Sequence, residues 1–163
     1  PDLLGNLPFV KSKKMVSDIL IRVETQLGFW MVGELTLMLA VGTMTYIGLK
    51  ILGVEVALPL AIIAGILELI PNIGPTISAI PAILVALTIH PFLAVSTTAL
   101  YFLVQFIENN FLVPKIMLKA VGVNPIFSIL GLMIGFRLAG PLGAILAIPT
   151  ILIIETIYLE LKK

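Results

Sequence analysis

Long uncharged stretches, separated by single charged residues or short polar breaks, run along most of the chain. They cover residues 35–49, 56–67, 69–89, 91–107, 120–136 and 138–154. A helix needs about 20 mostly apolar residues to cross ~30 Å of hydrocarbon, so several membrane helices must include an ionisable residue or stop short of a full crossing. The pattern predicts full spans over 26–50 and 91–111, a helical hairpin over 55–89 and a second hairpin over 125–159.

The segment before the first span is amphipathic. Between residues 9 and 24, apolar side chains such as Val10 and Ile19 alternate at helical spacing with charged ones such as Lys14. We expect a helix that either lies on the membrane surface or belongs to a soluble part of the protein, and that leads into the span. The polar, broken start at Pro1 suggests a piece of a longer chain.

The first hairpin is interrupted by prolines and a glycine. Pro71, Gly74 and Pro75 fall between its two arms, and Pro81 follows near the start of the second arm. Proline removes a backbone donor and clashes with the preceding turn, and Gly74 permits a left-handed turn. A second arm over 76–89 would be only ~21 Å long at 1.5 Å per residue, so the hairpin either barely crosses the bilayer or enters it and returns.

Small residues mark the second hairpin, whose turn falls at 137–141. Gly131 and Gly135 form a GxxxG pattern on its first arm, and Gly143 belongs to a stripe of small residues on its second arm. Small residues let membrane helices approach closely, so these three glycines are predicted helix-packing positions. Pro149 is expected to kink the last helix.

The composition places the chain among integral membrane proteins. Of 163 residues, 60% are hydrophobic and 12% are charged, whereas an ordinary soluble domain is about 45–50% apolar and about 25% charged. A globule of this size cannot hide so much apolar surface from water. We therefore predict an all-α fold, a polytopic transmembrane helical bundle with hairpins broken by Pro and Gly.

The scarcity of charged and nucleophilic residues excludes several classes of function. The net charge is +1, which gives no reason to expect a nucleic acid partner, and the chain has no cysteine and one histidine, His90. Disulfides, thiolate metal sites and a Cys nucleophile are excluded, and no phosphate loop, HExxH or GxSxG motif occurs. We expect no enzymatic activity, no metal and no cofactor, and we expect His90 to lie in a loop at the membrane surface.

The basic residues predict how the chain is oriented in the membrane. If the spans and hairpins are as above, eight Lys and Arg residues fall on the side that holds the N-terminus and two on the opposite side. The eight are Lys11, Lys13, Lys14, Arg22, Lys115, Lys119, Lys162 and Lys163, and the two are Lys50 and Arg137. Because positive residues favour the cytoplasmic side, we expect both ends of this chain in the cytoplasm.

Acidic and amide side chains near the first break are candidate functional residues. Glu68 lies in an apolar stretch directly before it, and Gln105, Glu108 and Asn109 fall on one helical face at i, i+3 and i+4. A carboxylate buried in a bilayer is costly and is typical of a pathway or relay, and a broken helix frees backbone groups for a solute or an ion. The alternatives are that Glu68 lies at headgroup level and that the second cluster satisfies the neighbouring broken backbone.

Two further charged residues lie within or beside predicted helices of the membrane. Glu34 falls inside the first span, where it is either a partnered buried carboxylate or a residue near the headgroups. Arg137 tops the second hairpin, and we expect it to extend its charge to the membrane surface rather than to attract an anionic solute.

Three motifs, in order along the chain, resemble signature stretches of the autoinducer-2 exporter-like (AI-2E) permease family. They are ELIPNIGP at 68–75 with AIPA at 79–82, QFIENNFLVPKIM at 105–117 with AVGVNP at 120–125, and GPLGAILAIP at 140–149. The resemblance covers residues 9–160, the C-terminal half to two-thirds of a family member. It implies a multi-span inner-membrane permease whose earlier helices are absent here, with residues 1–24 as the end of a cytoplasmic amphipathic segment and 25–163 as the transmembrane permease domain.

The resemblance also implies export of a small quorum-sensing signal, autoinducer-2 or a similar polar solute, and for some relatives sodium/proton antiport. On this interpretation the pathway residues are Glu68, Asn72, Gln105, Glu108 and Asn109, and the residues that shape or hinge the broken helix are Pro71, Gly74, Pro75 and Pro81. A proton or sodium gradient drives transport if Glu68 or Glu108 titrates. The alternative is a non-transporting oligomeric membrane scaffold, and in either case we expect the partners to be the lipid bilayer and further copies of the chain.

Overall fold

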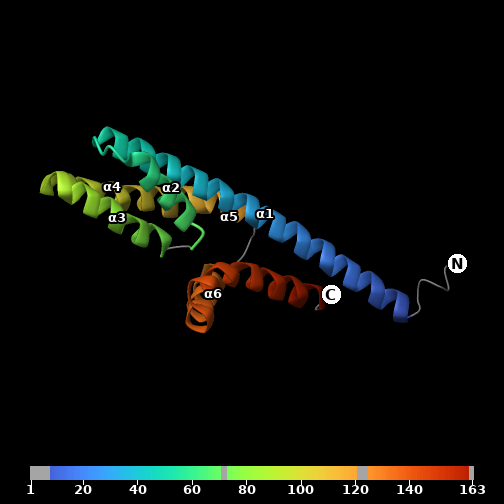
Figure 1. The fold of residues 1–163 in the computed structure, drawn as a ribbon. Coiled ribbons are helices and arrows are strands. Elements are labelled where there is room, and N and C mark those ends of the chain that lie inside the picture. The colour runs from blue at the N-terminus through green and yellow to red at the C-terminus, as the bar shows by residue number, and fades with distance from the viewer. Residues whose placement is uncertain (1–7, 71–72, 121–124, 162–163) are drawn as a thin grey trace. The chain divides into compact units, whose positions relative to one another are not determined.

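Helices make up nearly all of the part of the chain that the structure describes. The structure, a computed structural model, describes residues 8–70, 73–120 and 125–161. Its elements are α1 (Pro8–Ile51), α2 (Ala57–Leu67), α3 (Gly74–Ile89), α4 (Pro91–Ile107), the π-helix η1 (Glu108–Leu112), α5 (Val113–Ala120) and α6 (Pro125–Leu161) (Figure 1). Within these ranges there is no strand, and the predicted all-α fold is confirmed.

Within the described ranges, three helical stretches are long and apolar enough to cross a membrane. They are Val16–Ile51, Pro91–Met117 and Leu130–Tyr158. The chain is therefore a multi-pass membrane protein. The two arms of the first hairpin, α2 and α3, have only 11 and 16 residues, which is less than the about 20 that a full crossing needs.

Helix α1 is longer than the sequence pattern suggested. It runs from Pro8 to Ile51 without a break over 44 residues, where we expected an amphipathic helix over 9–24 followed by a span over 26–50. No proline lies inside it after Pro8, and each further residue extends the hydrogen-bond ladder without a new nucleation cost. The helix is thus not interrupted at the predicted boundary between residues 24 and 25.

Residues 32–122 form a compact unit with its own apolar core. Leu49, Val54, Ala57, Leu60, Ala64, Ala82 and Tyr101 make up this core. Two glycines bring α1 and α2 together, since a Cβ atom on Gly65 would lie 2.9 Å from the carbonyl oxygen of Met38 and 3.5 Å from Cα of Gly42. Close helix approach through small residues is typical of membrane proteins.

The turn between α3 and α4 is fixed by a cap. His90 has extended backbone angles, and its Nδ1 accepts a hydrogen bond from the backbone N–H of Phe92 at 3.1 Å. Pro91 occupies the first turn of α4, where its missing N–H costs nothing. His90 therefore lies in a connecting turn, as expected, and it also acts as the N-cap of α4.

Helix α6 consists of two arms that meet at a sharp kink. Ala139 and Gly140 have non-helical backbone angles, and Gly140 has φ of 59°. Gly135 and Gly143 face each other across the kink, because a Cβ atom on either one would lie within 2.3 Å of the carbonyl oxygen of the other. Further from the kink, a Cβ atom on Gly131 would meet Cδ1 of Ile151 at 2.1 Å. The GxxxG face thus packs against the second arm of the same hairpin.

Replacing Gly143 with alanine should destabilise this hairpin. The added methyl group would lie 1.9 Å from the carbonyl oxygen of Gly135, so the two arms must separate, and we expect the protein to lose about 2 kcal/mol of stability. Thermal denaturation in detergent measures the change, with Leu142→Ala as a neighbouring control because Leu142 is 69% exposed. An unchanged midpoint for Gly143→Ala would show that the arms do not touch there.

Candidate functional site

The first hairpin is broken where the prolines predicted it. Helix α2 ends at Leu67 and α3 begins at Gly74, and the chain between them tightens into short turns in which Ile70 N–H bonds to the Leu67 carbonyl at 2.9 Å. The backbone N–H of Gly74 then bonds to the Ile70 carbonyl at 2.8 Å. Two predicted residues of this break, Pro71 and Asn72, lie outside the described residues.

Gly74 has a different role from the one we expected. It is the first residue of α3 and is not among the glycines with positive φ, so it does not adopt the left-handed turn that glycine permits. A Cβ atom at this position would lie 1.8 Å from the carbonyl oxygen of Leu67. Glycine is required here because the two arms of the hairpin approach each other backbone to backbone. Pro75 is buried in the first turn of α3, and Pro81 lies inside the same helix.

A π-helical turn follows α4 at the second cluster of candidate residues. Residues Glu108–Leu112 form η1, and the eight-residue helix α5 continues from Val113. We expected the span to end at 111 and a loop, with room for a short helix, to follow over 112–124. A π-turn inserts an additional residue into the helix, which displaces the side chains that follow it around the axis, and such turns are frequent at functional sites. Glu108 is 4% exposed and Gln105 is half-buried, whereas Asn109 is exposed. The expectation that all three share one inward face is therefore wrong for Asn109.

Two of the predicted carboxyl groups meet inside the unit of residues 32–122. The side chains of Glu68 and Glu108 are hydrogen-bonded to each other. Glu68 is 2% exposed, and each of the two residues keeps one buried oxygen atom with no hydrogen-bond partner. An ionised carboxylate can only accept hydrogen bonds, so a bond between the two requires that one of them carries a proton. The arrangement is thus a buried pair of carboxyl groups that can share a proton.

Glu34 belongs to the same group. It lies on α1, is 3% exposed, and is close enough to interact electrostatically with both members of the pair. The sequence marked it only as an isolated carboxylate in an apolar stretch, and nothing in its spacing linked it to Glu68 or Glu108. In the described residues no group of three acidic or histidine side chains is arranged to hold a metal ion.

The carboxyl pair lies inside the length of a membrane-spanning helix. Glu108 is 17 residues after Pro91 and nine before Met117, the ends of that candidate span, which places it ~26 Å and ~14 Å from them along the axis. Because Glu68 reaches Glu108 from the end of α2, the broken tip of the hairpin lies at this level too. Arms this short, with their tip at this depth, are typical of a hairpin that enters the membrane and returns.

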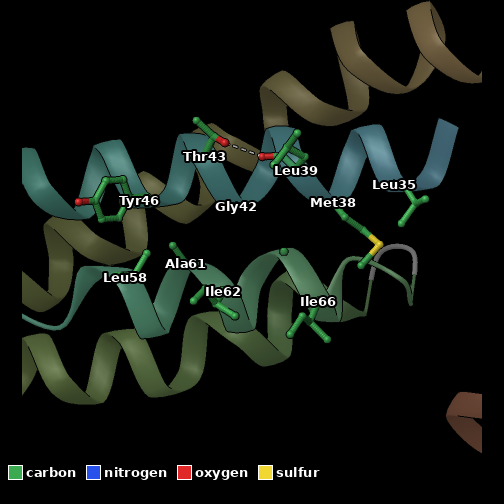
Figure 2. A pocket seen from close by; sticks show the side chains of 11 residues that line it. Leu35, Met38, Leu39, Gly42, Thr43, Tyr46, Leu58, Ala61, Ile62 and Ile66 are labelled. Atoms are coloured by element: carbon green, nitrogen blue, oxygen red, sulfur yellow. Dashed lines mark hydrogen bonds between the residues drawn. The ribbon is translucent and has the colours of Figure 1, made fainter. Parts of the chain in front are cut away.

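Two hollows open on the surface of this unit. A groove of about 460 Å³ lies between α1 and α2, and Figure 2 shows Leu39 and Tyr46 of α1 on one side of it and Leu58 and Ile62 of α2 on the other. Its lining is almost entirely apolar and includes none of the predicted pathway residues. A smaller hollow of about 270 Å³ lies between α3 and α4 and includes Gln105.

Comparison with known proteins gives a consistent result over almost the whole chain. The model of a family described as AI-2E family transporter matches residues 7–163. YrrI of Bacillus subtilis (strain 168), which is named as a transport protein, is 33% identical over 151 residues, or 93% of this chain and 43% of that protein. The AI-2 transport protein TqsA of Escherichia coli (strain K12) is 29% identical over 135 residues, or 82% of this chain and 39% of that protein. The chain thus spans less than half the length of these relatives.

Proposed function

Because the chain belongs to the AI-2E transporter family, we propose that it forms part of a permease that exports or exchanges a small polar solute across the inner (plasma) membrane. The name of TqsA, a relative, specifies AI-2, and we take autoinducer-2 or a similar signal as the solute. The observation that carries the proposal is the hydrogen-bonded pair of Glu68 and Glu108, buried at the tip of a broken hairpin. A carboxyl group buried at such a position destabilises a membrane protein, and ionisable groups inside membrane helices are typical of functional sites.

The proposed path passes beside this pair. Glu68, Gln105 and Glu108 are the residues that we assign to it. Breaks in membrane helices expose backbone dipoles only where protein or water surrounds them, and the two irregular segments, the end of α2 and η1, meet at the pair. Gly74, Pro75 and Pro81 shape the described part of the hairpin so that this meeting occurs.

The pair also supports coupling of transport to an ion gradient. A shared proton between Glu68 and Glu108 can leave when the solute arrives, and a sodium ion can take its place, since carboxylate oxygens are ligands for hard cations. We therefore propose that a proton or sodium gradient drives the permease. The basic residues predict that both ends of this chain face the cytoplasm, and we expect the permease to assemble from several copies.

No observation favours the alternative of a non-transporting scaffold. That alternative rested on a free GxxxG face at Gly131 and Gly135, and this face packs against the second arm of its own hairpin. A scaffold also has no use for buried carboxyl groups.

Flux through the intact protein tests the proposal. Liposomes that contain the purified protein and are loaded with autoinducer-2 should release it faster than protein-free liposomes, and an inward proton or sodium gradient should accelerate the release. Release no faster than from protein-free liposomes would contradict transport of this solute. Release that responds to neither gradient would contradict the coupling.

A further inference from the structure

The groove between α1 and α2 offers almost no hydrogen-bonding group along its length. Of the residues that line it, only Thr43 and Tyr46 carry a hydroxyl group. The hydroxyl of Thr43 already donates to the carbonyl oxygen of Leu39 at 2.7 Å, as Figure 2 shows. A polar solute in the groove would lose its hydrogen bonds to water without replacement, whereas a hydrocarbon chain would gain dispersion contacts along its whole length.

The groove is about as long as one leaflet of a bilayer is deep. Along α1 its lining runs from Leu35 to Tyr46, which is ~17 Å at 1.5 Å per residue. The hydrocarbon core of a bilayer is ~30 Å thick, so each leaflet contributes ~15 Å. Tyr46 and Leu58 lie at one end of the groove and Ile66 lies at the other (Figure 2). One acyl chain of a phospholipid, aligned with α1, therefore matches the groove in length.

The end of the groove at Tyr46 has the features of a membrane surface. The hydroxyl of Tyr46 points away from the other lining residues (Figure 2), and tyrosine is enriched where the hydrocarbon meets the headgroups. Lys50 follows one turn later on the same face of α1 and is exposed. A lysine at this level can extend its ammonium group to the phosphate of a headgroup. Glu55 is exposed in the turn that follows, and its charge disfavours a headgroup with a net negative charge.

A further helix fits the groove less well than an acyl chain does. A helix is about 10 Å or more across, so a stretch ~17 Å long fills more than about 1,300 Å³, whereas the groove has a volume of about 460 Å³. Membrane helices approach closely through small residues, but Gly42 and Gly65 are already in contact with each other at the seam of α1 and α2. An additional helix would touch mainly the large exposed side chains beside the seam, among them Leu39 and Ile62.

We propose that this groove is a specific site for one acyl chain of a phospholipid without net charge and that Lys50 binds the phosphate group. The chain covers the seam between the two helices and holds α2, the first arm of the broken hairpin, against α1. Ile66, at the far end of the groove, precedes Glu68 by two residues, so the bound lipid stabilises the arm that carries Glu68. This inference goes beyond the proposed transport function and does not rest on it.

Native mass spectrometry of the intact, detergent-purified protein tests the site by counting the phospholipids that the protein retains. Titration of the delipidated protein with phosphatidylethanolamine should restore one tightly bound molecule per subunit and raise the midpoint of thermal denaturation. Phosphatidylglycerol with the same acyl chains, which has a net negative charge, and diacylglycerol, which lacks the phosphate, should each need about threefold more lipid for half-saturation, the effect of one exposed charge interaction.

Filling the groove distinguishes this site from lipid that merely surrounds the protein. Thr43→Phe places an aromatic ring in the groove and should abolish the tightly bound molecule. Thr36→Phe is the matched control, because Thr36 is also exposed on α1 and its hydroxyl also donates to the carbonyl four residues earlier at 2.7 Å, but it does not line the groove. This variant should bind phosphatidylethanolamine as the unchanged protein does.

Removal of one lysine tests the headgroup contact separately. Lys50→Gln should raise the half-saturating concentration of phosphatidylethanolamine by about threefold. Lys115→Gln removes an exposed lysine from α5 and should leave the concentration unchanged. Because Lys50 is exposed, this variant should fold normally and remains a test even where Thr43→Phe does not fold.

Several results would overturn the inference. They are the absence of a tightly bound phosphatidylethanolamine, equal binding of phosphatidylglycerol or diacylglycerol, equal retention in Thr43→Phe and Thr36→Phe, and no effect of Lys50→Gln. A lower thermal midpoint of Thr43→Phe with undiminished lipid binding would also overturn it, and would indicate that a protein helix fills the groove.

Discussion

Changing Gly74 to alanine is expected to prevent the α2–α3 hairpin from closing and to destabilise the protein by more than about 3 kcal/mol, at the upper end of the cost of overpacking. The added Cβ atom would lie 1.8 Å from the carbonyl oxygen of Leu67 and 3.1 Å from the backbone nitrogen of Glu68. Both neighbours are backbone atoms, so no change of side-chain rotamer can relieve the clash. The arms would have to move apart, and Glu68 would lose its contact with Glu108.

The measurement is the fraction of the protein that remains monodisperse after extraction in detergent, together with the midpoint of thermal denaturation. Gly28→Ala is the matched control, because Gly28 lies inside α1 with nothing within 4 Å of an added Cβ atom. There alanine should stabilise the helix by about 0.5–1 kcal/mol. Equal behaviour of the two variants would show that Gly74 does not lie at a backbone contact.

The second large effect is expected on transport rather than on folding. Changing Glu108 to glutamine should reduce solute flux by roughly 10-fold or more, a loss of about 1.4 kcal/mol or more in the free energy of the limiting step. The amide group can still donate a hydrogen bond to Glu68, so stability should change by less than about 1 kcal/mol. It cannot release a proton, however, and the residual flux should no longer respond to a proton gradient. Glu68→Gln should have the same effect.

The flux assay on proteoliposomes measures this loss, with the thermal midpoint as the test of folding. Glu55→Gln is the control, because Glu55 is exposed in the turn between α1 and α2 and should transport normally. If Glu68→Gln and Glu108→Gln both retain full flux and the full response to the gradient, the carboxyl pair does not lie on the path.

The sequence predicted the breaks in the helices better than it predicted their continuity. Proline and glycine act on the backbone locally, which is why the interruptions after Leu67 and at Gly140 lie where the pattern put them. The unbroken course of α1 was missed because the side-chain pattern changes from amphipathic to apolar near residue 25, and such a change does not by itself interrupt a helical backbone.

The candidate site was only partly accessible from the sequence. Glu68 and Glu108 could be selected because each is an isolated charge in an apolar stretch. Their contact, however, joins residues 40 apart in sequence and depends on how α2 packs against α3 and α3 against α4. ENNFL itself contains neither proline nor glycine. The nearest signal for the π-turn is Pro114, which has no backbone N–H to donate to the carbonyl of Asn110. Helical spacing therefore placed Asn109 inward with Glu108, whereas the structure leaves it exposed.

The π-turn has a further consequence for α5. Each residue of an α-helix is rotated by about 100° around the axis relative to the one before it. The additional residue in η1 therefore determines the directions in which all side chains of α5 point. In that phase Ile116 and Met117 meet α1, where a Cβ atom on Gly33 would lie 3.4 Å and 3.2 Å from their side chains. Deletion of a single residue within 108–112 would restore a regular helix and rotate other side chains toward Gly33. A one-residue gap at this point in an alignment would thus signify a different docking face and not merely a shorter helix.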